Sequence, residues 1–231
     1  MKNIKPLTKR DIVKFLQLIN EKLAEQGQFG KIVICGGAAM TLAYNARNST
    51  YDIDALYKPK DAITDIIALI AVENRLGSQW LNDDVSIFTS ELKKLTTSSF
   101  LALSNLTVDI ADAECLLTMK LISAREDSHD LHDAAILIKH LGINSVEDLN
   151  VLLNDYDGVF HPKSLLISKE FAKAAFAQSK LLHRELQDVS VEPYTSVLEQ
   201  IASDRKKRKT NEKSPATHTG NKKKNRNDPE L

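Results

Sequence analysis

Hydrophobic and polar positions along the chain follow two kinds of spacing, one typical of helices and one typical of strands. Over residues 8–26 apolar side chains recur every three or four positions, which predicts an amphipathic helix with one buried stripe. The stripe consists of Ile12, Phe15, Leu16, Ile19 and Leu23. Thr8 can cap this helix because Asp11 lies three residues later, where its carboxylate reaches back to the cap.

Short runs rich in β-branched residues predict the strands. Residues 31–35 (KIVIC) form such a run between two glycines, and residues 100–103 and 106–110 form two more. In the last run Leu106, Val108 and Ile110 share one face, because successive side chains of a strand point to opposite sides. Asp109 is therefore expected to face away from the apolar side.

Helical spacing returns in residues 61–75 and dominates from residue 113 onward, with further helices predicted at residues 145–153 and 164–187. Ser145 and Asp148 are a predicted capping pair. We predict an α+β fold in which a small mixed β-sheet with flanking helices is followed by a C-terminal helical bundle. The core is placed at residues 1–112 and the helical domain at residues 113–202.

Composition changes near the C-terminus. Of the 31 Lys/Arg and 31 Asp/Glu residues, ten and four lie in residues 204–231, which leaves 21 and 27 in residues 1–203. Residues 203–231 have almost no apolar side chains, so we predict a disordered basic tail. The mildly acidic body argues against a broad nucleic-acid-binding face, whereas the basic blocks 205–209 and 222–224 could bind RNA phosphates or an acidic partner.

Cysteine usage and hydropathy predict a cytoplasmic protein. Cys35 and Cys115 occur in apolar surroundings without metal-ligand spacing, as expected for core thiols in a reducing compartment. The N-terminus lacks the apolar core of a signal peptide, and no apolar run approaches the length of a membrane span. We therefore expect no membrane association.

The candidate chemistry lies in residues 35–57 (CGGAAMTLAYNARNSTYDIDALY). Gly36 and Gly37 separate a predicted strand from a predicted helix, where the backbone can approach a ligand and the helix N-terminus favours phosphate. If residues 51–57 form a strand, Asp52 and Asp54 point to one side. Two such carboxylates repel each other unless a cation lies between them, and Mg²⁺ prefers carboxylate oxygens. Taken alone, the pair is more often a solvated strand end or turn.

The glycine pair followed after fourteen residues by Asp52-Ile53-Asp54 resembles the signature of the DNA polymerase β-like nucleotidyltransferase superfamily. In that superfamily a Gly-Gly or Gly-Ser turn precedes an Asp-x-Asp pair on the next strand, usually after a slightly shorter gap. Residues 47–54 (RNSTYDID) resemble the Arg-x-Ser-Thr-x-Asp-Ile-Asp of a bacterial branch related to AbiEii-type toxins. The resemblance implies the nucleotidyltransferase fold and an NTP substrate.

The same resemblance implies roles for individual residues. Asp52 and Asp54 are expected to hold magnesium, and Asp109 is the candidate third carboxylate that completes a second metal site. Loop residues Asp83 and Asp84 are competitors for that third position, and Asp109 could instead be a strand-end residue that caps the next helix. The glycine-pair backbone, Gly36-Gly37, is expected to contact the triphosphate. Arg47 is expected to support it.

A second motif in the helical part resembles another AbiEii-type pattern, in which Lys-Leu is followed by Arg and then Asp-x-x-Asp. Here it consists of Lys120, Arg125, Asp130 and Asp133. Lys120 is expected to bind the nucleotide's phosphates as a point charge. Asp130 and Asp133, three residues apart on a helix, share one face and could orient Lys120 or Arg125. Two ion-paired surface helices are the alternative.

These patterns predict a metal-dependent nucleotidyltransferase that moves an NMP from an NTP to a hydroxyl acceptor, with toxin-like transfer to tRNA or other RNA as the first choice. One alternative is an antitoxin-type enzyme that adenylylates a partner protein, although such proteins usually read Gly-Ser with Arg soon after. In either case a toxin or antitoxin is an expected protein partner. The other alternative is a catalytically silent nucleotide- or RNA-binding module. Arg125 and His129 are too close in sequence for the Arg-x4-6-His motif of helical RNases.

Overall fold

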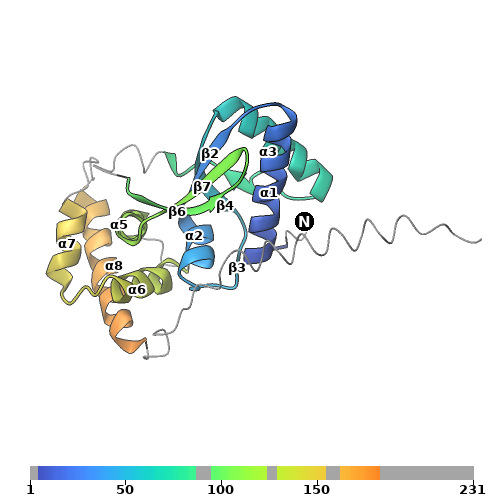
Figure 1. The fold of residues 1–231 in the computed structure, drawn as a ribbon. Coiled ribbons are helices and arrows are strands. Elements are labelled where there is room, and N and C mark those ends of the chain that lie inside the picture. The colour runs from blue at the N-terminus through green and yellow to red at the C-terminus, as the bar shows by residue number, and fades with distance from the viewer. Residues whose placement is uncertain (1–4, 87–94, 124–128, 155–161, 183–231) are drawn as a thin grey trace, which may run out of the picture. The chain divides into compact units, whose positions relative to one another are not determined.

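The computed structural model describes residues 5–86, 95–123, 129–154 and 162–182. Residue contacts divide the chain into two units, Met1–Tyr194 and Thr195–Leu231, and all described residues belong to the first. Figure 1 shows a sheet with helices beside it and a separate group of helices. This is the α+β arrangement that the sequence predicts. The domain boundaries at residues 112 and 202 stay predictions, and the basic tail lies outside the described residues.

Among the described residues, five strands form a mixed sheet in the order β5-β4-β2-β7-β6. They are β2 (Gly30–Ile34), β4 (Ile53–Lys58), β5 (Leu81–Asn82), β6 (Thr97–Ala102) and β7 (Leu106–Ala111). Strand β2 runs antiparallel to β4 and parallel to β7. A small second sheet pairs β1 (Leu7–Thr8) with β3 (Ser49–Thr50), which directly precedes the candidate acidic pair.

The apolar face of the main sheet forms the centre of the core. Six of its side chains are buried, namely Ile32, Ile34, Ile53, Ala55, Val108 and Ile110. Helices α1 (Lys9–Glu25) and α3 (Lys60–Asn74) contact each other and the sheet, and Figure 1 shows both beside it. Each fully buried Ile or Leu side chain contributes about 1.5–3 kcal/mol, so this face accounts for much of the folding free energy.

Thr8 caps α1 as predicted. Its Oγ1 accepts a hydrogen bond from the Asp11 N–H at 3.3 Å, and its own N–H donates to Asp11 Oδ2 at 3.0 Å. All five residues of the predicted stripe are buried. Because Thr8 also pairs with Ser49 in the small sheet, the beginning of α1 is attached to the segment that leads into the acidic pair.

Helices α5 (Ala113–Ser123), α6 (Asp130–His140), α7 (Val146–Asn154) and α8 (Pro162–Leu181) pack on one another as a helical group. The predicted capping pair of α7 is confirmed, since the Asp148 N–H donates to Ser145 Oγ at 3.2 Å. Cys35 and Cys115 are buried free thiols, also as predicted. None of the helices in the described ranges is both long and apolar enough to span a membrane.

Candidate functional site

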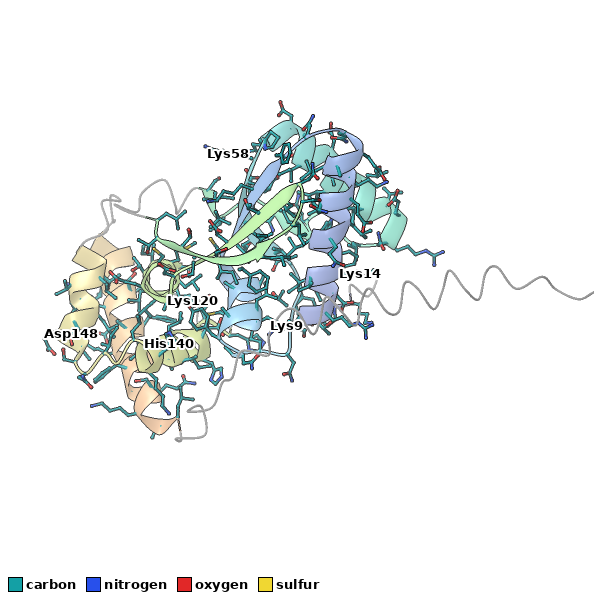
Figure 2. The ribbon with its side chains drawn as sticks, viewed as in Figure 1. Lys9, Lys14, Lys58, Lys120, His140 and Asp148 are labelled. Carbon is teal, nitrogen blue, oxygen red and sulfur yellow. The ribbon has the colours of Figure 1, made fainter. Side chains whose placement is uncertain are left out.

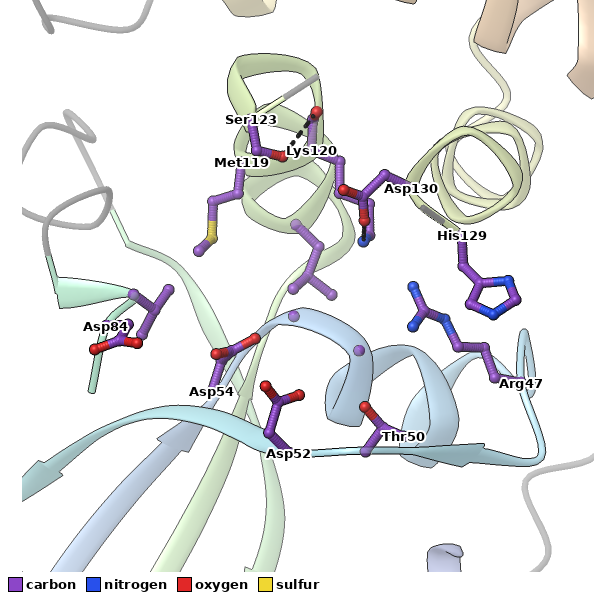
Figure 3. Close-up of a pocket in the computed structure, with 14 residues that line it drawn as sticks. Arg47, Thr50, Asp52, Asp54, Asp84, Met119, Lys120, Ser123, His129 and Asp130 are labelled. Atoms are coloured by element: carbon purple, nitrogen blue, oxygen red, sulfur yellow. Dashed lines mark hydrogen bonds and ion pairs between the residues drawn. The ribbon is translucent and has the colours of Figure 1, made fainter. Parts of the chain in front are cut away.

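A cleft of about 330 Å³ opens where the N-terminus of α2 (Gly36–Ala43) approaches α5 and the start of α6. The segment from β3 into β4 and the residues after β5 complete its walls. Seven of the nine predicted site residues line this cleft, namely Gly36, Gly37, Arg47, Asp52, Asp54, Lys120 and Asp130. Residues up to 94 positions apart in the sequence therefore meet at one place, as Figure 3 shows for the labelled side chains.

The two aspartates and the glycine turn are positioned by the pairing of β2 with β4. The Cys35 N–H, one residue before the turn, donates to the Asp54 carbonyl oxygen at 2.8 Å. Gly36 then adopts a left-handed φ of 57°, and a Cβ at this position would collide with Asp54 Oδ2. Only glycine satisfies both conditions without strain. Asp52 lies just before β4 rather than inside it, yet both carboxylates face the cleft (Figure 3).

Arg47 and Lys120 are held by the two aspartates of α6. Arg47 donates from Nε to Asp133 Oδ1 at 3.0 Å and from Nη2 to Asp133 Oδ2. Lys120 Nζ lies 2.7 Å from Asp130 Oδ1 and 2.8 Å from Asp133 Oδ2. We call these four residues the buried ion cluster. Asp133 does not line the cleft, but it joins both cations that do.

The burial of Asp133 and Lys120, with Arg47 and Asp130 only partly exposed, argues against the alternative of ion-paired surface helices. The Asp133 side chain is completely buried and that of Lys120 is 7% exposed. Lys14 and Lys58, by contrast, have exposed side chains (Figure 2). A buried charge without its partner costs several kcal/mol, so each member of the cluster depends on the others.

Asp109 does not reach the cleft, contrary to its predicted place as third carboxylate. In the strand register, Asp109 of β7 pairs with Val33 of β2. Asp54 of β4 lies opposite Cys35, two residues further along the chain than Val33 and on the other side of β2. Asp109 and Asp54 share a sheet face, but the Asp109 carboxylate turns toward Lys31, with 2.7 Å between Lys31 Nζ and Oδ2. Alternation along the strand predicted the face of the sheet on which Asp109 lies, but it did not predict that Lys31 lies beside it.

Several lining residues were not assigned to the site by sequence reasoning. Leu116 and Met119 have the helical spacing of core residues, yet they line the cleft together with Val85. Thr50 and His129 also line it. Of the two predicted competitors for the third carboxylate, Asp84 lines the cleft and Asp83 does not. Arg125, the remaining member of the second motif, lies outside the described residues.

The two ends of the cleft differ in chemistry. Figure 3 shows Arg47 and His129 at one end and Met119 and Asp84 at the other, with Asp52 and Asp54 between them. The first end offers cations and the second has the thioether of Met119 beside the Asp84 carboxylate. Leu116 and Val85 add apolar surface to the lining. A ligand with one polyanionic and one flat, apolar part matches this polarity.

Cys35 lies beneath the acidic pair as an inert thiol. Burial raises the pKa of Cys35 to about 12, and the negative charge of Asp54 contributes to the rise. A thiol with such a pKa stays protonated at neutral pH and is a poor nucleophile or metal ligand. The cysteine that adjoins the glycine turn is therefore a packing residue.

The acidic pair suits one magnesium ion. Mg²⁺ is typically held by one or two carboxylates, several waters and the substrate's phosphates, and Asp52 and Asp54 can provide the carboxylates. Within the described ranges, no three or more His, Cys, Asp or Glu side chains are grouped to hold a metal. These residues therefore provide no second metal site built on a third carboxylate.

Comparison with known proteins assigns the chain to a protein family. The profile of a family described as nucleotidyltransferases of unknown function (DUF6036) matches residues 11–164, more than half of the chain. The chain belongs to this family. The matched segment contains every residue that lines the cleft, so the nucleotidyltransferase assignment includes the site described above. Family membership supports a general nucleotidyl transfer function.

Two further comparisons add little to this assignment. A crystal structure of an antigenic nucleotidyltransferase-like protein from Paracoccidioides brasiliensis is similar, with 15% sequence identity and a TM-score of 0.40. That match covers 59% of this chain and 79% of the other. No protein with a curated description matches the chain significantly.

Proposed function

We propose that the chain transfers a nucleoside monophosphate from an NTP to a hydroxyl group on RNA. The observation that carries this proposal is the cleft itself, where a glycine turn at a helix N-terminus, two carboxylates and two cations converge. Phosphoryl transfer requires mainly that the protein position its substrates and neutralise their charge. The lining residues provide groups for both tasks.

The polarity of the cleft supports one orientation of the NTP. Its triphosphate would lie at the end with Arg47, Lys120 and the Gly36-Gly37 backbone, and its nucleoside would lie toward Met119 and Leu116. The α-phosphate then falls near Asp52 and Asp54, which lie between the two ends (Figure 3). Apolar contacts recognise the flat face of any base, so this orientation does not select one NTP.

Asp52 and Asp54 are the proposed ligands of Mg²⁺. When bound, the ion would neutralise phosphate charge and orient the acceptor hydroxyl. The hydroxyl oxygen attacks the α-phosphorus, its proton passes to solvent, and the bond to the bridging oxygen of the β-phosphate breaks. Pyrophosphate leaves. Arg47 and Lys120 stabilise the charge on that leaving group.

RNA as acceptor and a relation to AbiEii-type toxins rest on sequence features. Residues 47–54 and the set Lys120, Asp130 and Asp133 match both AbiEii-type motifs apart from Arg125, which is present in sequence but lies outside the described residues. The basic blocks 205–209 and 222–224 have the charge needed to contact RNA phosphates. An antitoxin would be the expected protein partner of such an enzyme.

Label transfer tests the proposal. The protein is incubated with Mg²⁺, each of the four α-labelled NTPs in turn, total tRNA and cell lysate. We expect label to enter RNA with wild type and with an Asp109→Asn control, but not with Asp52→Ala/Asp54→Ala. Label found only in lysate protein would replace RNA by a protein acceptor, as in the antitoxin-type alternative.

One observation favours a second candidate, a catalytically silent nucleotide-binding module. Among the described residues no third carboxylate is grouped with the acidic pair to hold a metal, and Asp109 is paired with Lys31. Magnesium-dependent NTP binding without transfer to any acceptor would support this candidate and contradict the proposal above.

A further inference from the structure

The second glycine of the turn leaves room for two side chains from elsewhere in the chain. A Cβ added to Gly37 would lie 2.8 Å from Thr50 Oγ1 and 3.0 Å from Arg47 Nη1. The Thr50 hydroxyl and the Arg47 guanidinium therefore occupy the space that a side chain at position 37 would need. No positive φ applies at Gly37, so this space, rather than backbone conformation, accounts for the glycine.

Thr50 is a buried residue whose hydroxyl faces the cleft. The residue is 5% exposed and lines the cleft beside Gly37. Its strand β3 is fixed by pairing with Leu7 of β1, and a β-branched side chain has little rotamer freedom. Among the described residues, none hydrogen-bonds to this hydroxyl. The Thr50 oxygen is not among the buried side-chain atoms that lack a partner, so it is accessible from the cleft, where a ligand can accept its hydrogen bond.

Two further donors converge on the same point. Arg47 uses Nε and Nη2 to hold Asp133, which leaves Nη1 directed toward Gly37. Helix α2 begins at Gly36 without a side-chain cap, so its first N–H groups are available to an anion. The hydroxyl, the guanidinium and the helix N-terminus thus surround one position, and all three are donors.

We propose that Thr50 donates a hydrogen bond to the triphosphate and thereby takes the place of the serine in a Gly-Ser turn. In the superfamily that this chain resembles, the second turn position is glycine or serine. Here a serine at position 37 would collide with Thr50 Oγ1. A hydroxyl group at this point of the cleft can therefore come from residue 37 or from residue 50, but not from both. This inference rests on the proposed function, since it names the group that contacts the NTP's phosphates.

A hydroxyl exchange tests the inference. Binding of inorganic tripolyphosphate and of ATP is measured by calorimetry in the presence of Mg²⁺, which requires no transfer reaction. Thr50→Val should weaken both about tenfold or more, because the variant loses one hydrogen bond to a charged group. Thr50→Ser keeps the hydroxyl and should stay within about threefold of wild type. Thr107→Val makes the same chemical change at an exposed strand position outside the cleft and should bind normally.

Gly37→Ser makes the test specific. Alone it should weaken tripolyphosphate binding, because it displaces Thr50 and Arg47. Combined with Thr50→Ala, which removes the nearer contact and the competing hydroxyl but leaves the contact with Arg47 Nη1, it should bind tripolyphosphate more tightly than Gly37→Ser alone. Thermal unfolding of each variant separates lost binding from lost fold.

The outcomes separate this inference from the proposed function. Unchanged tripolyphosphate binding in Thr50→Val, or a double variant no better than Gly37→Ser, would overturn the role of Thr50 even if nucleotidyl transfer is observed. The predicted binding pattern without transfer in wild type would support Thr50 while contradicting the enzyme. Absence of tripolyphosphate binding in folded wild type would overturn the inference.

Discussion

Two aspartate pairs at the cleft have opposite surroundings. Asp130 and Asp133 of α6 are held by Arg47 and Lys120, so the chain neutralises these charges itself. No cation among the described residues pairs with Asp52. Asp52 and Asp54 lie together against the glycine turn. A carboxylate without a cationic partner, such as Asp52, can attract an external cation, so the comparison assigns a structural role to the first pair and supports the metal binding proposed for the second.

The largest effect should follow from removing a proposed metal ligand. Asp52→Ala should lower nucleotidyl transfer by about 10³-fold or more, because a group at the reacting phosphate is lost. Its unfolding free energy should stay the same or rise, since one of two neighbouring like charges is removed. Transfer rates and urea unfolding measured on the same variant check both expectations. A large loss of stability would show that Asp52 belongs with the structural pair.

Asp133→Ala should have its main effect on stability. It leaves Arg47 and Lys120 without their shared partner and should lower the unfolding free energy by about 3–5 kcal/mol. Glu170→Gln is the matched control, because it breaks an exposed ion pair with Lys173 and should cost less than about 1 kcal/mol. Urea unfolding of the two variants checks the difference. Equally small losses of unfolding free energy in the two variants would mean that burial of the cluster does not contribute to stability.

A smaller effect concerns pH. The pKa of Cys35 is raised from 9.0 to about 12, so the folded state holds this proton more tightly than the unfolded state. Its contribution to stability is complete below about pH 9 and is lost as pH rises toward 12, at up to about 1.4 kcal/mol per pH unit. The unfolding free energy, measured at pH 8, 9 and 10, should therefore decrease more steeply with pH for wild type than for Cys35→Ala. Identical slopes would contradict the raised pKa.

The smallest effect is expected at Asp109. Its ion pair with Lys31 is largely exposed on the lysine side, and the carboxylate lies outside the cleft. Asp109→Asn should change stability by less than about 1 kcal/mol and transfer by less than about threefold. A loss comparable to that of Asp52→Ala would restore Asp109 as the third carboxylate and require the cleft to rearrange when substrate binds.

Sequence periodicity predicted the elements well because it reports which face of each one is buried. The stripe of α1, its Thr8 cap and the alternation in β7 all follow from neighbours within a few residues. The glycine turn and the acidic pair were found for the same reason, since the motif is local and β2 and β4 are adjacent in both sequence and space.

The rest of the site depends on contacts that no local pattern encodes. The direction of Asp109 depends on the register between β2 and β7, whose positions differ by more than seventy residues. The sequence suggested Lys120 or Arg125 as the partner of Asp133, and Lys120 does pair with it. The second partner, Arg47, lies 86 positions away and was not predicted. Leu116 and Met119 look like core residues because a cleft lined by apolar side chains has the same periodicity as a core.

The buried ion cluster also has a consequence for the evolution of the sequence. A relative that replaced Asp133 alone would leave Arg47 without its partner and Lys120 with Asp130 as its only partner in the cluster. One that replaced Lys120 alone would leave the buried carboxylate of Asp133 with Arg47 as its only partner in the cluster. Single steps away from the present set are therefore disfavoured, while joint changes to uncharged side chains of similar volume are tolerated. Positions 47, 120, 130 and 133 should accordingly vary among descendants as a group or not at all.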